Sequence, residues 1–301
     1  MHFQTRNMPF WMFLWDSVSL FSLRLLRLQQ PLRLADAVSA GGMMIYRGCG
    51  MLELSPDSDF TMSNRTSVLL SLCLVLWTAA CSAAANSNEA SRTARCNGYE
   101  QPYLVSLPNA SSAEKDQPLP AIVLLHGAGD KPSNMIAAWR HFAAKHKIIL
   151  LAPDLPRDPK FEDAAPQVFR CVVEDAKQQV RIDPARVYLF GNSMGGYLAY
   201  DGAMFESEYF AAIAVHAMRI APDYEWIVTR AHRKTPIAIY IGDHDQFFSQ
   251  DSVRKTRDLL RKAGFPVHYV ELENHDHNYY ARADEINADA WKFLKENRLA
   301  Q

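Results

Sequence analysis

The sequence is short of cysteine and of net charge, and both shortages exclude classes of protein. Five cysteines in 301 residues are too few for a small disulfide-rich scaffold. Cys96 and Cys171, the two within the expected folded domain, could pair or remain free thiols. The 32 basic residues nearly cancel the 33 acidic ones, so no broad field favours nucleic acid or an anionic membrane as a partner.

The chain offers little apolar sequence that could span a bilayer. The run from Val68 to Trp77 is too short for a stable membrane span. With Arg65 before it and small residues after it, this run has the pattern of a bacterial export signal over residues 62–85. Cleavage within Ala83 to Ala85 would release the protein, whereas processing before Cys81 would leave a lipid anchor. We therefore expect a periplasmic, secreted or lipid-anchored protein that meets the membrane only through lipidation of Cys81.

Two segments around this signal are expected to lie outside the fold. Residues 1–61 show no sustained helical or strand periodicity, and an export signal normally begins a chain. They are therefore expected to be an upstream non-native or disordered segment. The rival interpretation is a membrane-associated segment from Phe10 to Leu34, which charged residues and a proline interrupt. Residues 86–95 are polar and are expected to form a linker, which leaves residues 96–301 as the folded domain.

Beyond Cys96, short apolar runs alternate with longer amphipathic segments. This alternation predicts an α/β domain of about 200 residues, with helices on both faces of a mostly parallel sheet. The expected strands are Tyr103 to Leu107, Ala121 to Leu125, Ile148 to Ala152, Val187 to Phe190, Ala211 to His216, Ile237 to Ile241 and Val267 to Leu272. The expected helices are Asn134 to Lys145, Gln167 to Val180, Ser193 to Phe205, Asp251 to Ala263 and Ala283 to Glu296.

The run GNSMGG, which starts at Gly191, lies between an expected strand and an expected helix. It fits the G-x-S-x-G pattern of a nucleophilic serine on a sharp strand-to-helix turn, where Gly191 and Gly195 allow the backbones to approach closely. A helix that starts there directs free amides towards a reacting carbonyl oxygen, so the Met194 amide is an expected oxyanion donor. The motif therefore predicts Ser193 as a catalytic nucleophile.

With this motif and the preceding run DPARVY, which starts at Asp183, the chain resembles the α/β-hydrolase superfamily over roughly Pro118 to Leu299. The run looks like that of esterases and of polyhydroxybutyrate-depolymerase-like or feruloyl-esterase-like members. The resemblance implies a three-layer α/β-hydrolase fold and a serine carboxylic-ester hydrolase without a cofactor. It also implies that the serine, the acid and the histidine of a triad follow in that order along the chain.

The resemblance places the acid after the strand Ile237 to Ile241 and the base after the last strand. The turn GDHD offers Asp243 and Asp245, and the superfamily spacing G-x-x-D favours Asp245. His277 is favoured over His275 because an aromatic stretch and the last helix follow it. Asp243 and His275 remain open as alternatives. The same residues could bind Zn²⁺, although a metal site would leave the serine motif unexplained.

The turn HGAGD, which starts at His126, is similar to the turn that supplies a second oxyanion amide in this superfamily. Ala128 is the expected donor, and His126 is expected to be structural. Asp130, Asn192 and Phe247 lie next to these motifs and are candidates for substrate binding. Nothing in the sequence indicates the oligomeric state.

Only about twenty residues separate the strand that ends at His216 from the strand that starts at Ile237, which leaves little room for a cap domain. The resulting open site suits small-molecule or polymeric esters. Aromatic residues that could line it, or pack in the core, are Tyr224, Trp226, Phe247 and Phe248. A thioesterase or peptidase of the same fold, or a non-catalytic hydrolase-like binding protein, is an alternative interpretation.

Overall fold

The computed structural model describes residues 45–47, 50–52, 88–96, 98–108, 117–156 and 159–300. The chain divides into two compact units, Met1–Ala85 and Asn86–Gln301. In the first unit, β1 (Ile45–Arg47) pairs antiparallel with β2 (Gly50–Leu52). The expected export signal and its Cys81 lipidation site lie outside the described residues, as does nearly all of the expected upstream segment.

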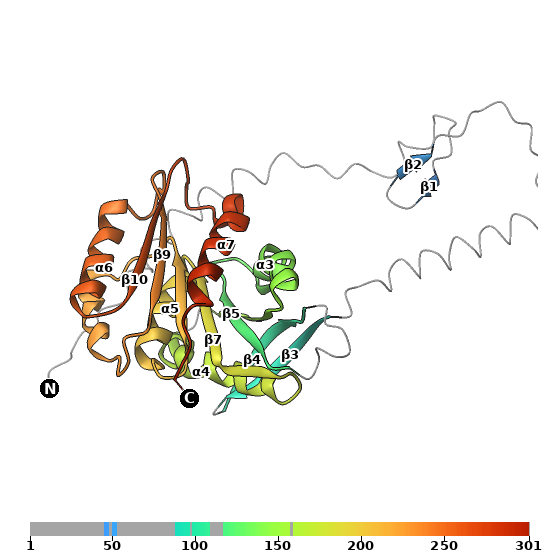
Figure 1. Ribbon diagram of the computed structural model, residues 1–301, viewed down its shortest axis with the longest axis horizontal. Helices are drawn as coiled ribbons and strands as arrows, with labels where there is room; N and C mark the ends of the chain where they lie inside the picture. The colour runs from blue at the N-terminus through green and yellow to red at the C-terminus, as the bar shows by residue number, and fades with distance from the viewer. Residues whose placement is uncertain are drawn as a thin grey trace, which may run out of the picture. The chain divides into compact units, whose positions relative to one another are not determined.

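The second unit contains an eight-stranded sheet with the strand order β10-β9-β8-β7-β5-β6-β4-β3 (Figure 1). Its strands are β3 (Glu89–Cys96), β4 (Tyr99–Ser106), β5 (Leu119–Leu125), β6 (Ile149–Pro153), β7 (Ile182–Asn192), β8 (Ala212–His216), β9 (Ile237–Gly242) and β10 (Val267–Leu272). β4 runs antiparallel to both of its neighbours, and all other pairs are parallel. The seven expected strands are confirmed.

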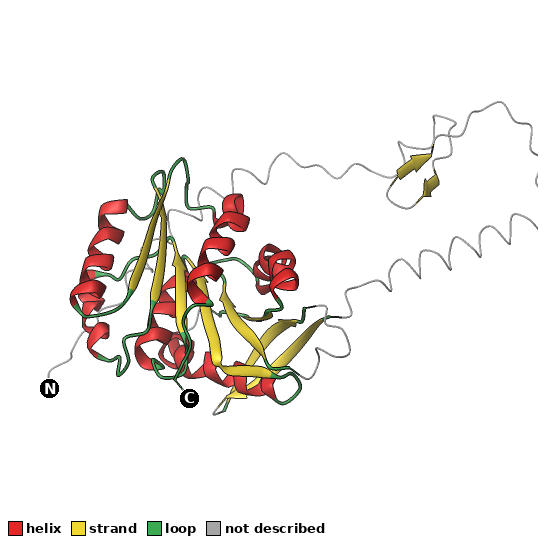
Figure 2. Cartoon of the chain, viewed as in Figure 1, coloured by secondary structure: helices red, strands yellow, loops and turns green. Residues whose placement is uncertain are grey.

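Helices lie on both sides of this sheet (Figure 2). They are α3 (Pro132–His146), α4 (Pro159–Lys177), α5 (Met194–Phe205), α6 (Gln250–Lys262) and α7 (Ala283–Leu294), with the 3₁₀ helices η3 (Pro222–Thr229) and η4 (Tyr279–Arg282). Apolar residues of α4, α5 and α6 form one core with one face of the sheet, and those of α3 and α7 form a second core with the other face. None of the described helices has both the length and the apolar character that a membrane crossing needs.

The sequence of β5 explains the two cores. Val123 and Leu125 pack in the first core, whereas Ile122 and Leu124 pack in the second. Successive residues of a strand point to opposite faces, and helices cover both faces here. A strand in this position therefore has to be apolar at every residue, as the run AIVLL is. The α/β fold-class prediction is confirmed.

The linker prediction is wrong over most of its length. Residues 89–95 belong to β3, which pairs with β4 along its whole length. Of the residues in β3, only Ala94 and Cys96 are buried, because β3 is the last strand of the sheet and its other side chains meet solvent. Its composition is therefore as polar as that of a linker. Cys96 forms a disulfide with Cys171 of α4, which joins this edge strand to the helical layer.

The helix predictions agree with α3, α5, α6 and α7 to within two residues at each end. α4 is the exception, because it begins at Pro159 and continues through Pro166 rather than starting at Gln167. In the connection from β8 to β9, where every residue is described, η3 is the one regular element. This connection therefore contains no cap domain.

Candidate active site

Ser193, Asp245 and His277 come from three loops at one edge of the sheet. Ser193 follows β7, Asp245 follows β9 and His277 follows β10. The strands from β7 to β10 are parallel neighbours, so their carboxyl ends lie at the same edge. In open α/β sheets this edge is where ligands bind. Residues that are 84 positions apart in sequence, such as Ser193 and His277, meet there.

A continuous hydrogen-bonded chain joins these three side chains. His277 Nε2 is 2.9 Å from Ser193 Oγ, and His277 Nδ1 is 2.8 Å from Asp245 Oδ2. A carboxylate only accepts, so a neutral His277 carries its proton on Nδ1 and donates it to Asp245. Its Nε2 is then free to accept the hydroxyl proton of Ser193. This is the geometry of a nucleophile, a general base and an orienting acid.

The carboxylate of Asp245 is completely buried and fully hydrogen-bonded. Its Oδ1 accepts the backbone amides of Phe247 and Phe248, each at 2.8 Å. Burial by itself would raise the pKa of Asp245, but the hydrogen bond and charge of His277, with these two amides, outweigh it and lower the pKa. Asp245 therefore stays ionised and can both orient His277 and stabilise its protonated form.

The turn at Ser193 is held in an unusual backbone conformation, with φ 52° and ψ −120°. The Ser193 amide donates to the carbonyl oxygen of His216 at 2.9 Å, which anchors the turn to β8. The flanking glycines allow the backbones to come together, because a Cβ on Gly191 would lie 2.2 Å from the Gly195 oxygen. A Cβ on Gly195 would lie 2.1 Å from the Leu125 oxygen. This crowding explains the glycines of the motif.

We expect Gly195→Ala to lower the free energy of unfolding by about 3 kcal/mol or more, because the new methyl group meets rigid backbone atoms of β5. Chemical denaturation of both proteins measures the difference. Gly127→Ala is the matched control, because its Cβ would have only ordinary contacts, the nearest at 3.4 Å. Equal stability of Gly195→Ala and Gly127→Ala would contradict the close packing described above.

Two backbone amides next to Ser193 are available to a ligand. Met194 opens α5, and Ala128 lies in an exposed turn that the Asp130 amide closes on the Gly127 oxygen at 3.2 Å. A Cβ on Gly127 would lie 3.5 Å from Ser193 Cβ, so this turn lies against the serine. Neither the Met194 amide nor the Ala128 amide donates to another residue in the described part of the chain. Both amides can therefore serve as oxyanion donors.

His126 has a structural position. Its side chain is 2% exposed, and its Nε2 accepts the Leu155 amide at 3.1 Å. Nδ1 then carries the proton and donates to the Gly127 oxygen at 2.9 Å. Both ring nitrogens are thus used in holding the turn that contains Ala128, as expected for a structural histidine.

The alternative acid and base have other partners. Asp243 accepts the His275 amide at 3.1 Å and hydrogen-bonds His244 Nδ1 at 2.7 Å. Desolvation would raise the pKa of Asp243, but the amides of Asn274 and His275 and the His244 side chain lower it to about 2. The His275 ring is buried against His216 instead of facing the serine. Among the described residues, no three His, Cys, Asp or Glu side chains are grouped to hold a metal ion.

Phe247 and its neighbours differ in exposure. Phe247 is 41% exposed, and its ring meets the His277 ring edge-on with the ring centroids 4.6 Å apart, so it lies directly beside the candidate base. Phe248 is buried against the other residues of the core. Tyr224 packs on Tyr197, whereas Trp226 is 51% exposed on η3. Of these aromatic candidates, Phe247 is the one that both contacts His277 and faces solvent.

The other two candidates for substrate binding already have protein partners. Asp130 accepts Tyr280 Oη on one carboxylate oxygen, and the Lys131 amide and the Asn134 side chain on the other. It therefore ties the Ala128 turn to the segment after His277. Asn192 is 7% exposed and its Oδ1 hydrogen-bonds His216, so this oxygen already has a protein partner. Its side chain points into the domain because β7 is buried up to its last residue.

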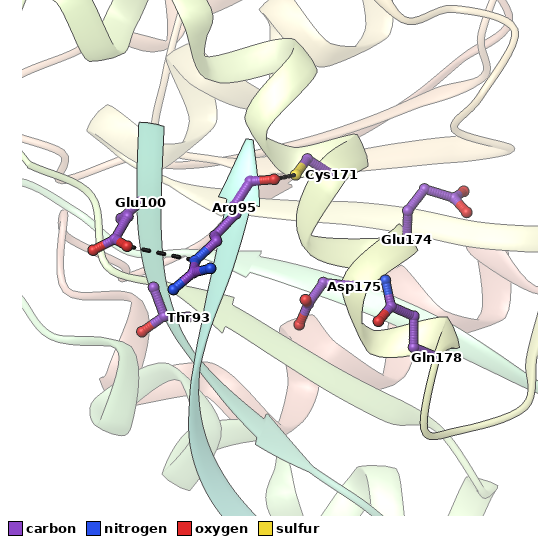
Figure 3. A pocket seen from close by; sticks show the side chains of 7 residues that line it. All are labelled: Thr93, Arg95, Glu100, Cys171, Glu174, Asp175 and Gln178. Atoms are coloured by element: carbon purple, nitrogen blue, oxygen red, sulfur yellow. Dashed lines mark hydrogen bonds and ion pairs between the residues drawn. The ribbon is translucent and has the colours of Figure 1, made fainter. Parts of the chain in front are cut away.

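A separate hollow of about 750 Å³ lies between β3, β4 and α4 (Figure 3). Its lining residues are Thr93, Arg95, Glu100, Cys171, Glu174, Asp175 and Gln178. In Figure 3, Cys171 and Asp175 of α4 lie towards Arg95, whose side chain is 3.6 Å from Glu100 on the neighbouring strand. None of the candidate catalytic residues lines this hollow.

Comparison with known proteins bears on both fold and family. Residues 156–297, slightly less than half of the chain, match the dienelactone hydrolase family. No match was found among curated proteins. Similar solved structures include a thermostable esterase, with 21% identity over 70% of this chain and 63% of that chain and a TM-score of 0.57. This chain thus spans less than two thirds of that esterase.

Two further structures are similar over nearly their whole length. The S-formylglutathione hydrolase from Agrobacterium tumefaciens is 20% identical, over 70% of this chain and 95% of that chain, with a TM-score of 0.54. Esterase 2 from Thermogutta terrifontis, phosphorylated by paraoxon, is 16% identical, over 70% of this chain and 94% of that chain, with a TM-score of 0.59. At these identities the likeness establishes the fold.

The sheet, the serine turn and these comparisons define the class of fold: the chain has an α/β-hydrolase fold, and its residues 156–297 resemble the dienelactone hydrolase family. The match to the dienelactone hydrolase family and the esterase folds together support a hydrolase.

Proposed function

We propose that the chain is a serine hydrolase that cleaves carboxylic esters through an acyl-enzyme on Ser193. The observation that carries this proposal is the chain of hydrogen bonds from Ser193 Oγ through His277 to Asp245, at 2.9 and 2.8 Å. A serine hydroxyl is a weak nucleophile until a base takes its proton, and His277 Nε2 is the base within reach.

In the first half of the reaction, Ser193 Oγ attacks the ester carbonyl carbon while its proton passes to His277 Nε2. The carboxylate of Asp245 stabilises the imidazolium without taking the proton. His277 then gives the proton to the alcohol oxygen as the carbon–oxygen bond breaks. In the second half, a water molecule loses a proton to His277 and attacks the acyl-enzyme. Ser193 regains its proton as the carboxylic acid leaves.

The amides of Met194 and Ala128 stabilise the negative oxygen of each tetrahedral intermediate. The Met194 amide lies at the N-terminus of α5, where the helix dipole adds to its effect. The Ala128 amide comes from a turn that His126 and Asp130 hold in place. Loss of one oxyanion donor typically costs about a hundredfold or more in turnover.

Covalent labelling tests this proposal. The full chain is incubated with a fluorophosphonate probe, digested, and examined by mass spectrometry, and its hydrolysis of p-nitrophenyl acetate and butyrate is measured. An esterase of similar fold is phosphorylated by paraoxon, which makes a phosphorus electrophile a suitable probe. We expect a single adduct on Ser193 and loss of ester hydrolysis in proportion to labelling, because the probe needs the activated hydroxyl.

Substrate profiling separates the remaining interpretations. A chain that hydrolyses thioesters or peptides but none of a panel of oxygen esters is a hydrolase of another specificity. A chain that neither reacts with the probe nor hydrolyses any of these substrates would overturn the proposed function and favour a binding protein of this fold.

A further inference from the structure

Two buried histidines that the proposed mechanism does not use lie between the serine turn and the base loop. His216, the last residue of β8, is fully buried, and His275 is 2% exposed. Their Nε2 atoms are 2.9 Å apart, and His216 Nδ1 is 2.8 Å from Asn192 Oδ1. Asn192, His216 and His275 thus form one buried chain of hydrogen bonds, here called the histidine chain.

The two ends of the histidine chain adjoin the proposed catalytic residues. Asn192 directly precedes Ser193, and His275 lies two positions before His277. His216 also binds the serine turn through its backbone, because its carbonyl oxygen accepts the Ser193 amide at 2.9 Å. The histidine chain therefore links the serine turn after β7 to the base loop after β10 through the end of β8.

The base loop is anchored at His275 by its backbone as well. The His275 amide donates to Asp243, and its carbonyl oxygen accepts the His244 amide at 2.9 Å. A Cβ on Gly242 would lie 2.0 Å from the same carbonyl oxygen, so the end of β9 packs directly on His275. With its backbone held on both sides, His275 presents Nε2 to His216 in a defined direction.

The hydrogen bonds of the histidine chain define where each proton lies. Asn192 Oδ1 only accepts, so His216 Nδ1 carries a proton. A neutral imidazole has one N–H, so His216 Nε2 accepts and His275 Nε2 donates. Burial, with the neighbouring His275 and His277, lowers the pKa of His216 to about 3, and burial also lowers the pKa of His275. Both rings are therefore neutral at pH 7.

We propose that Asn192, His216 and His275 are positioning residues that hold the Ser193 turn and the His277 loop at hydrogen-bonding distance. This inference rests on the proposed function. Ser193 has a positive φ, a strained conformation that persists only where its surroundings enforce it. His277 stands in a loop without regular structure. A displacement of about 1 Å between such groups can cost about a hundredfold in rate.

Substitution of His275 tests the histidine chain. His275→Leu removes the Nε2 donor with little change in bulk, and we expect kcat for p-nitrophenyl butyrate to fall about 10- to 100-fold. KM should change less than about twofold, because the side chain is buried away from substrate. His275→Gln keeps an amide donor of similar reach and should retain kcat within about fivefold. A merely structural histidine would not show this rescue.

His268→Leu is the matched control, because it removes a histidine of β10 that hydrogen-bonds Asp289 at 2.7 Å and has no contact with the site. Its kcat should equal that of wild type. The proposal is overturned if His275→Leu has the kcat of wild type, or if His275→Gln loses as much activity as His275→Leu.

NMR of the wild-type full chain, labelled with ¹⁵N at histidine, tests the same proposal without any variant. We expect neutral rings at pH 7, with the proton on Nδ1 of His216 and on Nε2 of His275. A cationic ring at either position, or a His216 proton on Nε2, would overturn it. A wild type without ester hydrolysis or Ser193 labelling overturns the proposed function instead, and the NMR result stands apart from that outcome.

Discussion

Ser193→Ala is expected to lower kcat for p-nitrophenyl esters by about ten-thousandfold to a millionfold. The change deletes Oγ, the atom that forms the acyl bond, and with it the 2.9 Å hydrogen bond to His277. The oxyanion amides of Met194 and Ala128 belong to the backbone and remain, so a small residual rate above that of water is expected. Steady-state kinetics of both proteins measures the change in kcat, and thermal unfolding shows whether the variant is folded.

The matched control for this prediction is Ser91→Ala on β3. Ser91 is exposed and lies on the edge strand, away from the carboxyl end of β7. Its substitution should leave both kcat and the fluorophosphonate adduct unchanged. Activity of Ser193→Ala within tenfold of wild type, with the fold intact, would mean that another residue attacks the ester.

Asp245→Asn is expected to lower kcat by about a thousandfold to ten-thousandfold. Asn has both a donor and an acceptor, and it can present its NH₂ group to His277 Nδ1. His277 would then place its proton on Nε2 and could no longer accept the proton of Ser193. The side chain is buried and its other oxygen accepts two backbone amides, so the substitution changes the chemistry more than the shape.

Asp243→Asn is the matched comparison, because it makes the same chemical change two residues away. Asp243 accepts the His275 amide through Oδ1, and an asparagine keeps such an oxygen. We expect kcat within about fivefold of wild type, since the bond is retained and the triad is not touched. A larger loss for Asp243→Asn than for Asp245→Asn would reverse the assignment of the acid.

The short connection between β8 and β9 contributes no cap domain to the carboxyl end of the sheet. η3 is its one regular element, and Phe247 remains 41% exposed beside His277. The expectation that the substrate is a small-molecule or polymeric ester stays a prediction, and the rates at which the full chain hydrolyses esters of both kinds test it.

Much of the fold was predictable because the pattern that encodes it is local. The runs that form β5, β8 and β9 are apolar at nearly every residue, as a strand covered on both faces requires. The helix α5 was predictable from the serine motif that precedes it and from the apolar residues along one of its faces. β3 was not predicted, because only two of its residues are buried. Its other residues meet solvent and are polar, so the segment lacks the apolar pattern of a strand.

The site was partly predictable for a related reason. Ser193 is marked by the glycines on either side, which the close approach of β5 and α5 requires. The choice of Asp245 and His277 over their neighbours rested on a resemblance, since all four residues lie in similar polar turns. The tertiary structure supplies the physical distinction: Asp245 and His277 hydrogen-bond each other and the serine, whereas Asp243 and His275 are occupied elsewhere.

By itself, the sequence determined the order of strands and helices along the chain, the serine turn and the loops that follow β9 and β10. Those features depend on the spacing of apolar and small residues within short stretches of sequence. Only the tertiary structure decided that Cys96 meets Cys171, that Asn192 points inward, and that His216 joins His275. Such contacts depend on the direction of side chains from separate elements, and no local pattern of residues encodes that direction.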